Sequence, residues 1–251
     1  MKDAYRQVRN RIGEAAERAG RRAEEITLVA VTKNATPDQI RSLVELGHAD
    51  LGENRVQQLG QRVAQLEEFV SRHRTLGRAS TRMEELVPPK VRWHMIGHLQ
   101  RNKIKHVAPL VSMIHSVDSL RLAEELHAFG NKRDIVSDVL LQVNVSGETS
   151  KYGIAVPAVS HVAEQLDTMM HLRVRGLMTM APYADDPEDV RHVFARTREL
   201  FLELKQTDLV GPQFNILSMG MSNDFEVAIE EGANVVRVGR ALFGEAAEEE
   251  Q

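Results

Sequence analysis

The sequence predicts a single TIM-type (β/α)8 barrel with an extra helix at its N-terminus. Three observations support this fold: eight short apolar runs are spaced along the chain, each is followed by an amphipathic helical pattern, and short loops join them. Strands that alternate with helices pair in parallel through βαβ crossovers. Because 251 residues suit one such barrel, we expect a single domain over residues 1–251.

The predicted strands are rich in Val, Ile and Leu. They cover residues 28–33, 49–52, 91–97, 113–116, 139–145, 172–178, 214–218 and 235–238. An open doubly wound sheet is the alternative architecture for this alternation. The chain lacks an early Gly-x-Gly-x-x-Gly fingerprint and a Gly-x-x-x-x-Gly-Lys loop, so dinucleotide and P-loop sites have no support.

Helix starts follow the predicted strands. The clearest has Thr36 as N-cap, Pro37 at the first helical position and Gln39 completing a capping box. Later helices are predicted to begin near Asn54, Asn102, Asp118, Pro157, Asp186 and Ser222. The extra helix precedes the first strand and has apolar residues at helical spacing, such as Val8 and Ile12.

Two stretches interrupt this pattern. Residues 71–90 lack periodicity and contain scattered arginines and a Pro-Pro pair, so we expect a surface insertion that is mobile or weakly helical at 83–87. Residues 245–251 are acidic, and we expect them to fray.

Composition excludes several classes of protein. The 32 basic and 36 acidic residues give a net charge of −4, so there is no general basic field for nucleic acid. The absence of cysteine removes thiolate catalysis, cysteine metal sites and disulfides. The charged N-terminus does not resemble a signal peptide, and no apolar run could span a bilayer. We therefore expect a cytoplasmic protein without membrane partners.

Lys33 ends the first predicted strand and precedes the capped helix. In (β/α)8 barrels, functional side chains lie at the carboxyl ends of the strands. We therefore interpret Lys33 as the reactive group of a site at the mouth of the barrel. A solvated lysine at a loop edge is the alternative.

Two glycine-bearing loops follow the last two strands, where barrels commonly bind phosphate. Gly220 and Ser222 lie in the first loop, and Gly239 and Arg240 lie in the second. Backbone amides beside glycines and at helix starts favour anions, so these loops predict a phosphate site. Ordinary turns are the alternative, because glycine is common after strands.

Lys33 and the two loops together fit pyridoxal 5′-phosphate (PLP), whose aldehyde needs an amine and whose phosphate needs amides. The last strand of a closed barrel neighbours the first, which brings these groups together. Arg237 in the last strand is predicted to reach the pyridine nitrogen and keep it unprotonated, because a fixed cation opposes a second positive charge. A buried ion pair is the alternative role for Arg237.

Ordered motifs cover nearly the whole chain. They are Val-Ala-Val-Thr-Lys at 29–33, Gly-Glu-Asn at 52–54, Trp-His-Met-Ile-Gly-His-Leu-Gln-Arg-Asn-Lys at 93–103, His-Ser-Val-Asp at 115–118, Gln-Val-Asn-Val-Ser at 142–146, Ser-Lys-Tyr-Gly at 150–153, Arg-Gly-Leu-Met at 175–178, Leu-Ser-Met-Gly-Met-Ser-Asn-Asp at 217–224 and Arg-Val-Gly-Arg-Ala-Leu-Phe-Gly at 237–244. Together they resemble the pyridoxal phosphate homeostasis protein family, whose barrel is similar to the N-terminal domain of bacterial alanine racemase.

The resemblance implies a set of cofactor-binding residues. They are Lys33 as the aldimine lysine, Asn54 beside the cofactor, and Ser222, Arg237, Gly239 and the amide of Arg240 around phosphate and ring. The chain departs from the family in two places. Arg240 replaces a typical small hydroxyl residue, and it either adds a charge to the phosphate or points outward. The segment at 71–90 is longer and more basic than the family pattern.

Three further residues have weaker claims. His94 and His98 are four apart on a predicted strand, roughly 13 Å along its axis, which is too far for one metal ion. We predict packing or hydrogen bonding for both and no metal site. Lys151 is either a second amine near the pocket or a surface charge.

These features predict a monomeric protein that holds PLP as a Lys33 aldimine and releases or transfers it to recipient apo-enzymes, without turnover of its own. One alternative is a single-barrel amino-acid racemase or related PLP enzyme, although alanine racemases use a further β domain and a tyrosine from a second subunit. Another is a phosphosugar or phosphoanion barrel enzyme in which Lys33 forms a Schiff base with the substrate carbonyl.

Overall fold

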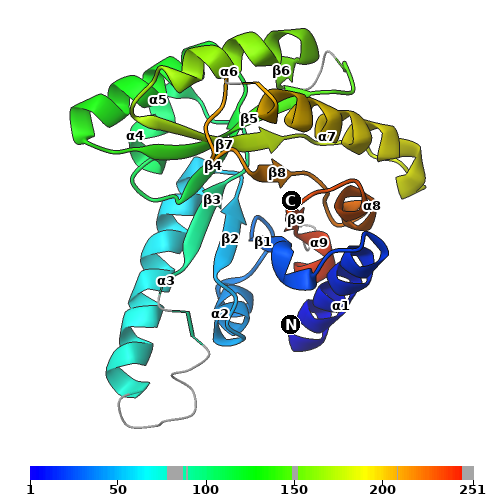
Figure 1. Cartoon of the computed structure of the whole chain (residues 1–251). Helices are drawn as coiled ribbons and strands as arrows, with labels where there is room; N and C mark the ends of the chain where they lie inside the picture. The colour runs from blue at the N-terminus through cyan, green and yellow to red at the C-terminus, as the bar shows by residue number, and fades with distance from the viewer. Residues whose placement is uncertain (78–86, 89, 149–151, 208, 245–251) are drawn as a thin grey trace, which may run out of the picture.

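The strands of the chain close into a barrel (Figure 1). The computed structural model describes residues 1–77, 87–88, 90–148, 152–207 and 209–244. Its main strands are β1 Thr27–Val31, β2 Asp50–Glu53, β3 Arg92–Met95, β4 Met113–Val117, β5 Ser137–Asn144, β7 Leu172–Met178, β8 Ile216–Ser218 and β9 Val235–Val238. Within the described ranges these eight strands pair in parallel in the ring β1-β2-β3-β4-β5-β7-β8-β9, and β9 pairs with β1. The predicted barrel is therefore confirmed, and the alternative open sheet is wrong.

Helices cover the outside of the ring (Figure 1). The α-helices are α1 Lys2–Arg18, α2 Pro37–Glu45, α3 Val56–Gly77, α4 Ile104–Val107, α5 Leu120–Arg133, α6 Val159–Asp167, α7 Arg191–Lys205, α8 Phe225–Glu230 and α9 Arg240–Phe243. Short 3-10 helices are η1 Ala23–Glu25, η2 Arg101–Lys103, η3 Val156–Ala158 and η4 Pro187–Val190. The predicted extra helix is α1, which packs against α8 and α9. The helix predicted near Asn102 is split between η2 and α4.

Local signals fix several helix starts. The Thr36 side chain accepts a hydrogen bond from the Gln39 amide over 3.2 Å, and the Gln39 side chain accepts one from the Thr36 amide over 2.8 Å. The predicted capping box is therefore confirmed, with Pro37 as the first residue of α2. Asp186 likewise caps η4, where its side chain accepts from the Glu188 amide over 2.9 Å.

Two groups of buried apolar side chains support the barrel. The larger group includes Val139 and Leu141 of β5 and lies between strands and helices. Leu140, between them in sequence, belongs to a smaller group with Met113 and Met178. Successive side chains of a barrel strand alternate between the outside and the interior, so the smaller group lies inside the ring.

Helix α3 is longer than predicted. It continues to Gly77, so the interruption expected from residue 71 is wrong for 71–77. Positions 78–86 and 89 lie outside the described residues, as does the predicted frayed tail at 245–251. The weak helix predicted at 83–87 therefore falls almost wholly outside the description.

A short strand that the sequence did not predict follows β5. β6, Ile154–Ala155, pairs in parallel with Val143 and Asn144 of β5. Gly153 precedes it with a φ of 140°, and a Cβ there would lie 2.7 Å from the Asn144 amide nitrogen.

Among the helices of the described ranges, none has both the length and the apolar character needed to cross a bilayer.

Candidate functional site

A cavity of about 490 Å³ opens at the carboxyl ends of the strands. It is lined by residues that follow β1, β2, β3, β5, β7, β8 and β9, together with Val31, Gln142 and Arg237 within the strands. Its volume lies in the ordinary range for small-molecule sites. All of the predicted cofactor-binding residues line it: Lys33, Asn54, Ser222, Arg237, Gly239 and Arg240.

Lys33 lies in the turn between β1 and α2, two residues beyond the end of the strand, so the predicted strand over 28–33 is two residues too long at this end. Its side chain is exposed and reaches the cavity wall. No described residue forms a hydrogen bond or an ion pair with its amine. The amine is therefore accessible to a ligand, as expected for a reactive lysine.

A buried ion pair holds the turn that carries Lys33. Glu53 at the end of β2 is fully buried and contacts Arg62 of α3 over 2.7 Å. Arg62 also donates to the carbonyl oxygen of Thr32 and, over 3.2 Å, to that of Ala35. The Thr32 hydroxyl donates to Glu53 Oε2 over 2.9 Å. One guanidinium therefore connects β2 to both sides of the turn.

Asn54 provides a buried acceptor in the cavity wall. Its backbone amide donates to Glu53 Oε1 over 2.9 Å, whereas its side-chain Oδ1 is buried without a hydrogen-bond partner among the described residues. Gly97 packs closely on it, because a Cβ at Gly97 would lie 2.2 Å from the Asn54 carbonyl oxygen. Buried polar atoms are normally paired, so the unpaired Oδ1 fits a residue that contacts a ligand.

Ser222 joins the two glycine-bearing loops. Its Oγ accepts hydrogen bonds from the amides of Gly239 over 3.2 Å and Ala241 over 3.3 Å. Gly220 has a φ of 91°, and a Cβ there would lie 2.6 Å from Ala228 Cβ, so the close turn requires glycine. The two loops therefore lie together as predicted. The Gly239 amide, predicted to bind phosphate, donates to Ser222 in this structure.

Asp224 shapes the first of these loops from within. Its Oδ1 accepts a hydrogen bond from the Met221 amide over 2.6 Å. Burial raises the pKa of Asp224, and the amide hydrogen bond acts in the opposite direction. Next to it, the Asn223 side chain donates to the Ala184 carbonyl oxygen over 2.9 Å and ties the loop after β7 to the same wall.

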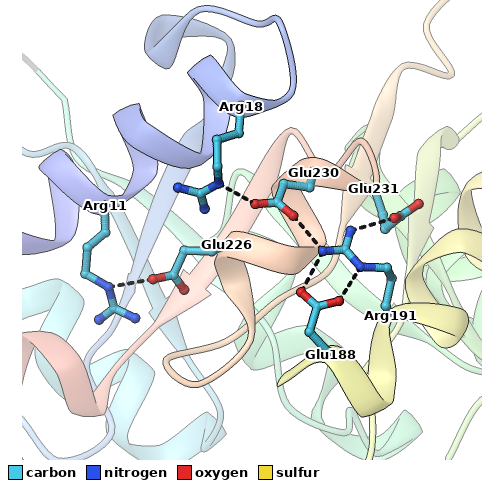
Figure 2. Close-up of polar contacts among 7 residues, drawn as sticks. All are labelled: Arg11, Arg18, Glu188, Arg191, Glu226, Glu230 and Glu231. Atoms are coloured by element: carbon cyan, nitrogen blue, oxygen red, sulfur yellow. Dashed lines mark hydrogen bonds and ion pairs between the residues drawn. The ribbon is translucent and has the colours of Figure 1, made fainter. Parts of the chain in front are cut away.

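Ion pairs hold α8, the helix that continues from the Ser222 loop (Figure 2). They are Arg11–Glu226 at 2.6 Å, Arg18–Glu230 at 2.7 Å, Arg191–Glu230 at 2.6 Å and Arg191–Glu231 at 2.8 Å. Arg191 also contacts Glu188 of η4 over 2.7 Å. Because Arg11 and Arg18 belong to α1, the extra N-terminal helix helps to fix the element behind the loop.

Arg237 is a buried cation that reaches the cavity. Only 3% of its surface is exposed; its Nη1 donates to Ser218 Oγ over 2.6 Å and its Nη2 to the Thr179 carbonyl oxygen over 2.9 Å. Burial lowers the pKa of Arg237 to about 10, against the opposing charge of Asp224. It forms no ion pair with another described residue, so the predicted alternative of a buried ion pair is wrong.

The remaining candidates lie at the rim or away from the cavity. Arg240 is exposed and lines the cavity. His98 contacts Asp118 over 2.9 Å and stacks on Tyr152, with 4.0 Å between ring centroids. Lys151 lies outside the described residues.

His94 lies on β3 and is buried. Its Nδ1 is 2.9 Å from His115 Nε2, and its Nε2 is 3.1 Å from Asp50 Oδ1. The hydrogen bonding predicted for His94 and for His98 is therefore confirmed.

Sequence reasoning missed the roles of Glu53 and Arg62. A signal existed for Glu53, because this carboxylate directly follows the predicted strand at 49–52 and would need a partner if it were buried. None existed for Arg62, which sits on a helix among other polar residues. The sequence analysis also missed Asn223 and Asp224 as residues that shape the loop after β8, although both lie in the motif at 217–224.

Comparisons with known proteins agree on one family. The family described as alanine racemase, N-terminal domain, matches residues 7–247. The chain is 40% identical over 242 residues to the pyridoxal phosphate homeostasis protein of Aquifex aeolicus strain VF5, covering 95% of each chain. It is 35% identical over 238 residues to the protein of that name from Escherichia coli K12, covering 95% of this chain and 93% of the relative.

Solved structures show the same relationship. PipY of Synechococcus elongatus PCC7942 with PLP bound has 31% identity and a TM-score of 0.75, over 93% of this chain and 100% of PipY. Alanine racemase of Clostridium difficile 630 shares the fold alone, at 14% identity and a TM-score of 0.67, over 98% of this chain and 57% of the racemase. The chain therefore belongs to the alanine racemase N-terminal domain family and, within it, to the pyridoxal phosphate homeostasis proteins.

Proposed function

We propose that this chain binds PLP as an aldimine of Lys33 and serves PLP homeostasis by holding and releasing the cofactor, without turnover of its own. The observation that carries the proposal is the cavity itself. It combines an unpaired lysine amine, a buried acceptor on Asn54 without a described partner, and two adjoining glycine-bearing loops. The PLP named in the PipY structure carries an aldehyde that an amine can bind and a phosphate that such loops can hold.

Each residue has a proposed role. The Lys33 amine would condense with the PLP aldehyde, forming one C=N bond and releasing one water. Ser222, Gly239 and the amide of Arg240 would hold the phosphate, with the Gly239 amide exchanging its Ser222 partner for a phosphate oxygen. Asn54 would lie beside the ring, and Arg237 would face the pyridine nitrogen. When bound, PLP would supply an electrophilic carbon for amines.

An absorbance spectrum tests the covalent attachment. PLP-loaded protein should show an internal-aldimine band at about 420 nm. Borohydride reduction followed by peptide mass mapping should place the pyridoxyl group on Lys33. Lys33→Ala should abolish the band, whereas Lys132→Ala, at an exposed lysine in α5 that does not line the cavity, should retain it. Retention of the band in Lys33→Ala, or a tag on Lys151, would refute the assignment.

The absence of turnover needs a separate measurement. Loaded protein mixed with an amino acid in deuterated water should give no α-proton exchange above the uncatalysed rate. Exchange above that rate would favour the racemase alternative. A protein that binds phosphosugars and shows no aldimine band would instead support the phosphoanion-enzyme alternative. The recipient apo-enzymes, the monomeric state and the cytoplasmic location stay predictions.

A further inference from the structure

Buried polar side chains form a continuous line through the barrel. From Arg237 it runs to Ser218 Oγ over 2.6 Å, on to His115 Nδ1 over 3.1 Å, from His115 Nε2 to His94 Nδ1 over 2.9 Å, and from His94 Nε2 to Asp50 Oδ1 over 3.1 Å. All five residues are buried, with at most 8% of their surface exposed. The line ends at Arg92, whose Nε donates to Asp50 Oδ1 over 2.7 Å and whose Nη2 contacts Oδ2 at 2.5 Å.

The line crosses the interior of the ring. Ser218 lies on β8 and His115 lies on β4, and these strands are separated by β5 and β7. A hydrogen bond between strands that are not neighbours must pass through the barrel. Asp50 at the start of β2 is thereby connected to Arg237, which lines the cavity.

The two ends of the line favour one direction. A guanidinium can only donate hydrogen bonds and an ionised carboxylate can only accept them. Burial raises the pKa of Asp50, but hydrogen bonds from His94 and Arg92 outweigh burial and bring the pKa well below its ordinary value, so Asp50 is ionised. Burial also lowers the pKa of His115 well below its ordinary value, so this ring is neutral and carries one N–H.

We propose that Asp50, His94, His115 and Ser218 form a one-way hydrogen-bond chain that positions Arg237 as a donor to the cavity. Each group donates toward Asp50: Ser218 to His115, His115 Nε2–H to His94, and His94 Nε2–H to Asp50. Ser218 Oγ then presents its lone pairs to Arg237. Two of the five N–H groups of Arg237 have partners among the described residues, which leaves donors for a ligand.

This chain deepens the proposed function, because the ligand atom that Arg237 meets is taken to be the PLP ring nitrogen. Ser218 and the two histidines do not line the cavity. They are therefore positioning residues that act through Arg237. The carboxylate whose charge acts on the buried guanidinium is Asp224, and Asp50 reaches Arg237 only through the hydrogen-bond chain.

NMR of the ligand-free protein tests the direction of the chain. At about pH 8, where an ordinary imidazole is neutral, nitrogen-15 signals should place the proton on Nε2 of both His94 and His115. A proton on Nδ1 of His115 would overturn the proposal. In Ser218→Ala, the Arg237 guanidinium signals should lose the exchange protection that they show in the unmodified protein, and unchanged protection would also overturn it.

A double-mutant cycle tests positioning through Arg237. Ser218→Ala should weaken PLP binding about tenfold, the usual scale for a hydrogen bond to a charged group. In an Arg237→Gln background the same change should have no further effect. Thr197→Val is the control, since it removes a buried hydroxyl that donates within α7 to the Val193 carbonyl oxygen over 2.7 Å. An equal loss in both backgrounds would overturn the proposal.

The two measurements separate this proposal from the proposed function. If the unmodified protein fails to bind PLP, the proposed function fails. The NMR result on the ligand-free protein then tests the one-way hydrogen-bond chain by itself. If PLP binds but His115 carries its proton on Nδ1, the proposed function stands and the one-way chain fails.

Discussion

The ion pair between Arg62 and Glu53 should be a strong determinant of stability. The side chain of Glu53 is 0% exposed and that of Arg62 is 15% exposed, so the pair is shielded from solvent. Arg62→Met keeps much of the aliphatic volume and removes the charge. It leaves a buried carboxylate without its cation, for which the expected cost is about 3–5 kcal/mol of unfolding free energy.

Urea unfolding followed by circular dichroism measures this cost by linear extrapolation. The double variant Arg62→Met with Glu53→Gln should recover a large part of the loss, because no uncompensated charge remains. Arg41→Met is the matched control, since its exposed pair with Asp38 on α2 should contribute less than about 0.5 kcal/mol. A loss below about 1 kcal/mol for Arg62→Met would refute the reasoning.

The same variant should affect the candidate site. Arg62 donates to Thr32 and Ala35 on either side of Lys33, so its removal frees the turn. PLP binding should weaken about tenfold even in conditions where the protein remains folded, because ordering the lysine turn then adds to the cost of binding. Unchanged affinity in folded Arg62→Met would show that the turn keeps its conformation without the guanidinium.

Three other perturbations have defined outcomes. Burial lowers the pKa of His48 from 6.5 to about 4, so as the pH falls the unfolded chain is protonated at His48 before the folded protein is. About 3 kcal/mol of unfolding free energy should therefore be lost between about pH 6.5 and about pH 4. His48→Gln should remove this pH dependence from the free energies measured by urea unfolding. Arg191→Ala should lower the unfolding free energy by about 1 kcal/mol at low salt and by less at high salt. Arg196→Ala, whose ion pairs lie within α7, should leave the unfolding free energy almost unchanged in the same urea-unfolding assay. Gly220→Ala should destabilise the fold by about 2–4 kcal/mol in urea unfolding, because a positive φ and a contact at 2.6 Å both oppose a side chain.

Features with local causes were predictable from sequence. The capping box of α2 depends on Thr36 and Gln39, which are three residues apart. The positions of Lys33 and Gly239 follow from the ends of two apolar runs, and parallel pairing of β1 with β9 brings them together. Motif resemblance, rather than periodicity, supplied Asn54 as a site residue.

Features that depend on partners across the barrel were not predictable from sequence. Ser218 and His115 are 103 residues apart and bond through the interior. Whether Arg237 contacts a carboxylate or a hydroxyl depends on which side chains of the other strands lie at the same height along the barrel axis. A single sequence does not specify how the strands are aligned along that axis. The length of α3 was missed because arginines and a glycine obscured its apolar periodicity beyond residue 71.

The interior of the barrel holds both apolar side chains and the hydrogen-bonded polar line from Arg237 to Asp50, and this polar line is better explained by function than by stability. Met113, Leu140 and Met178 show that apolar side chains can fill the same ring. Replacing a buried charged network by apolar residues is often neutral or stabilising, so the polar line is poorly explained by stability alone. It leads to a cation in the cavity wall. A donor that is held in place before the ligand arrives needs less reorganisation on binding, and a ring of apolar residues could not provide it.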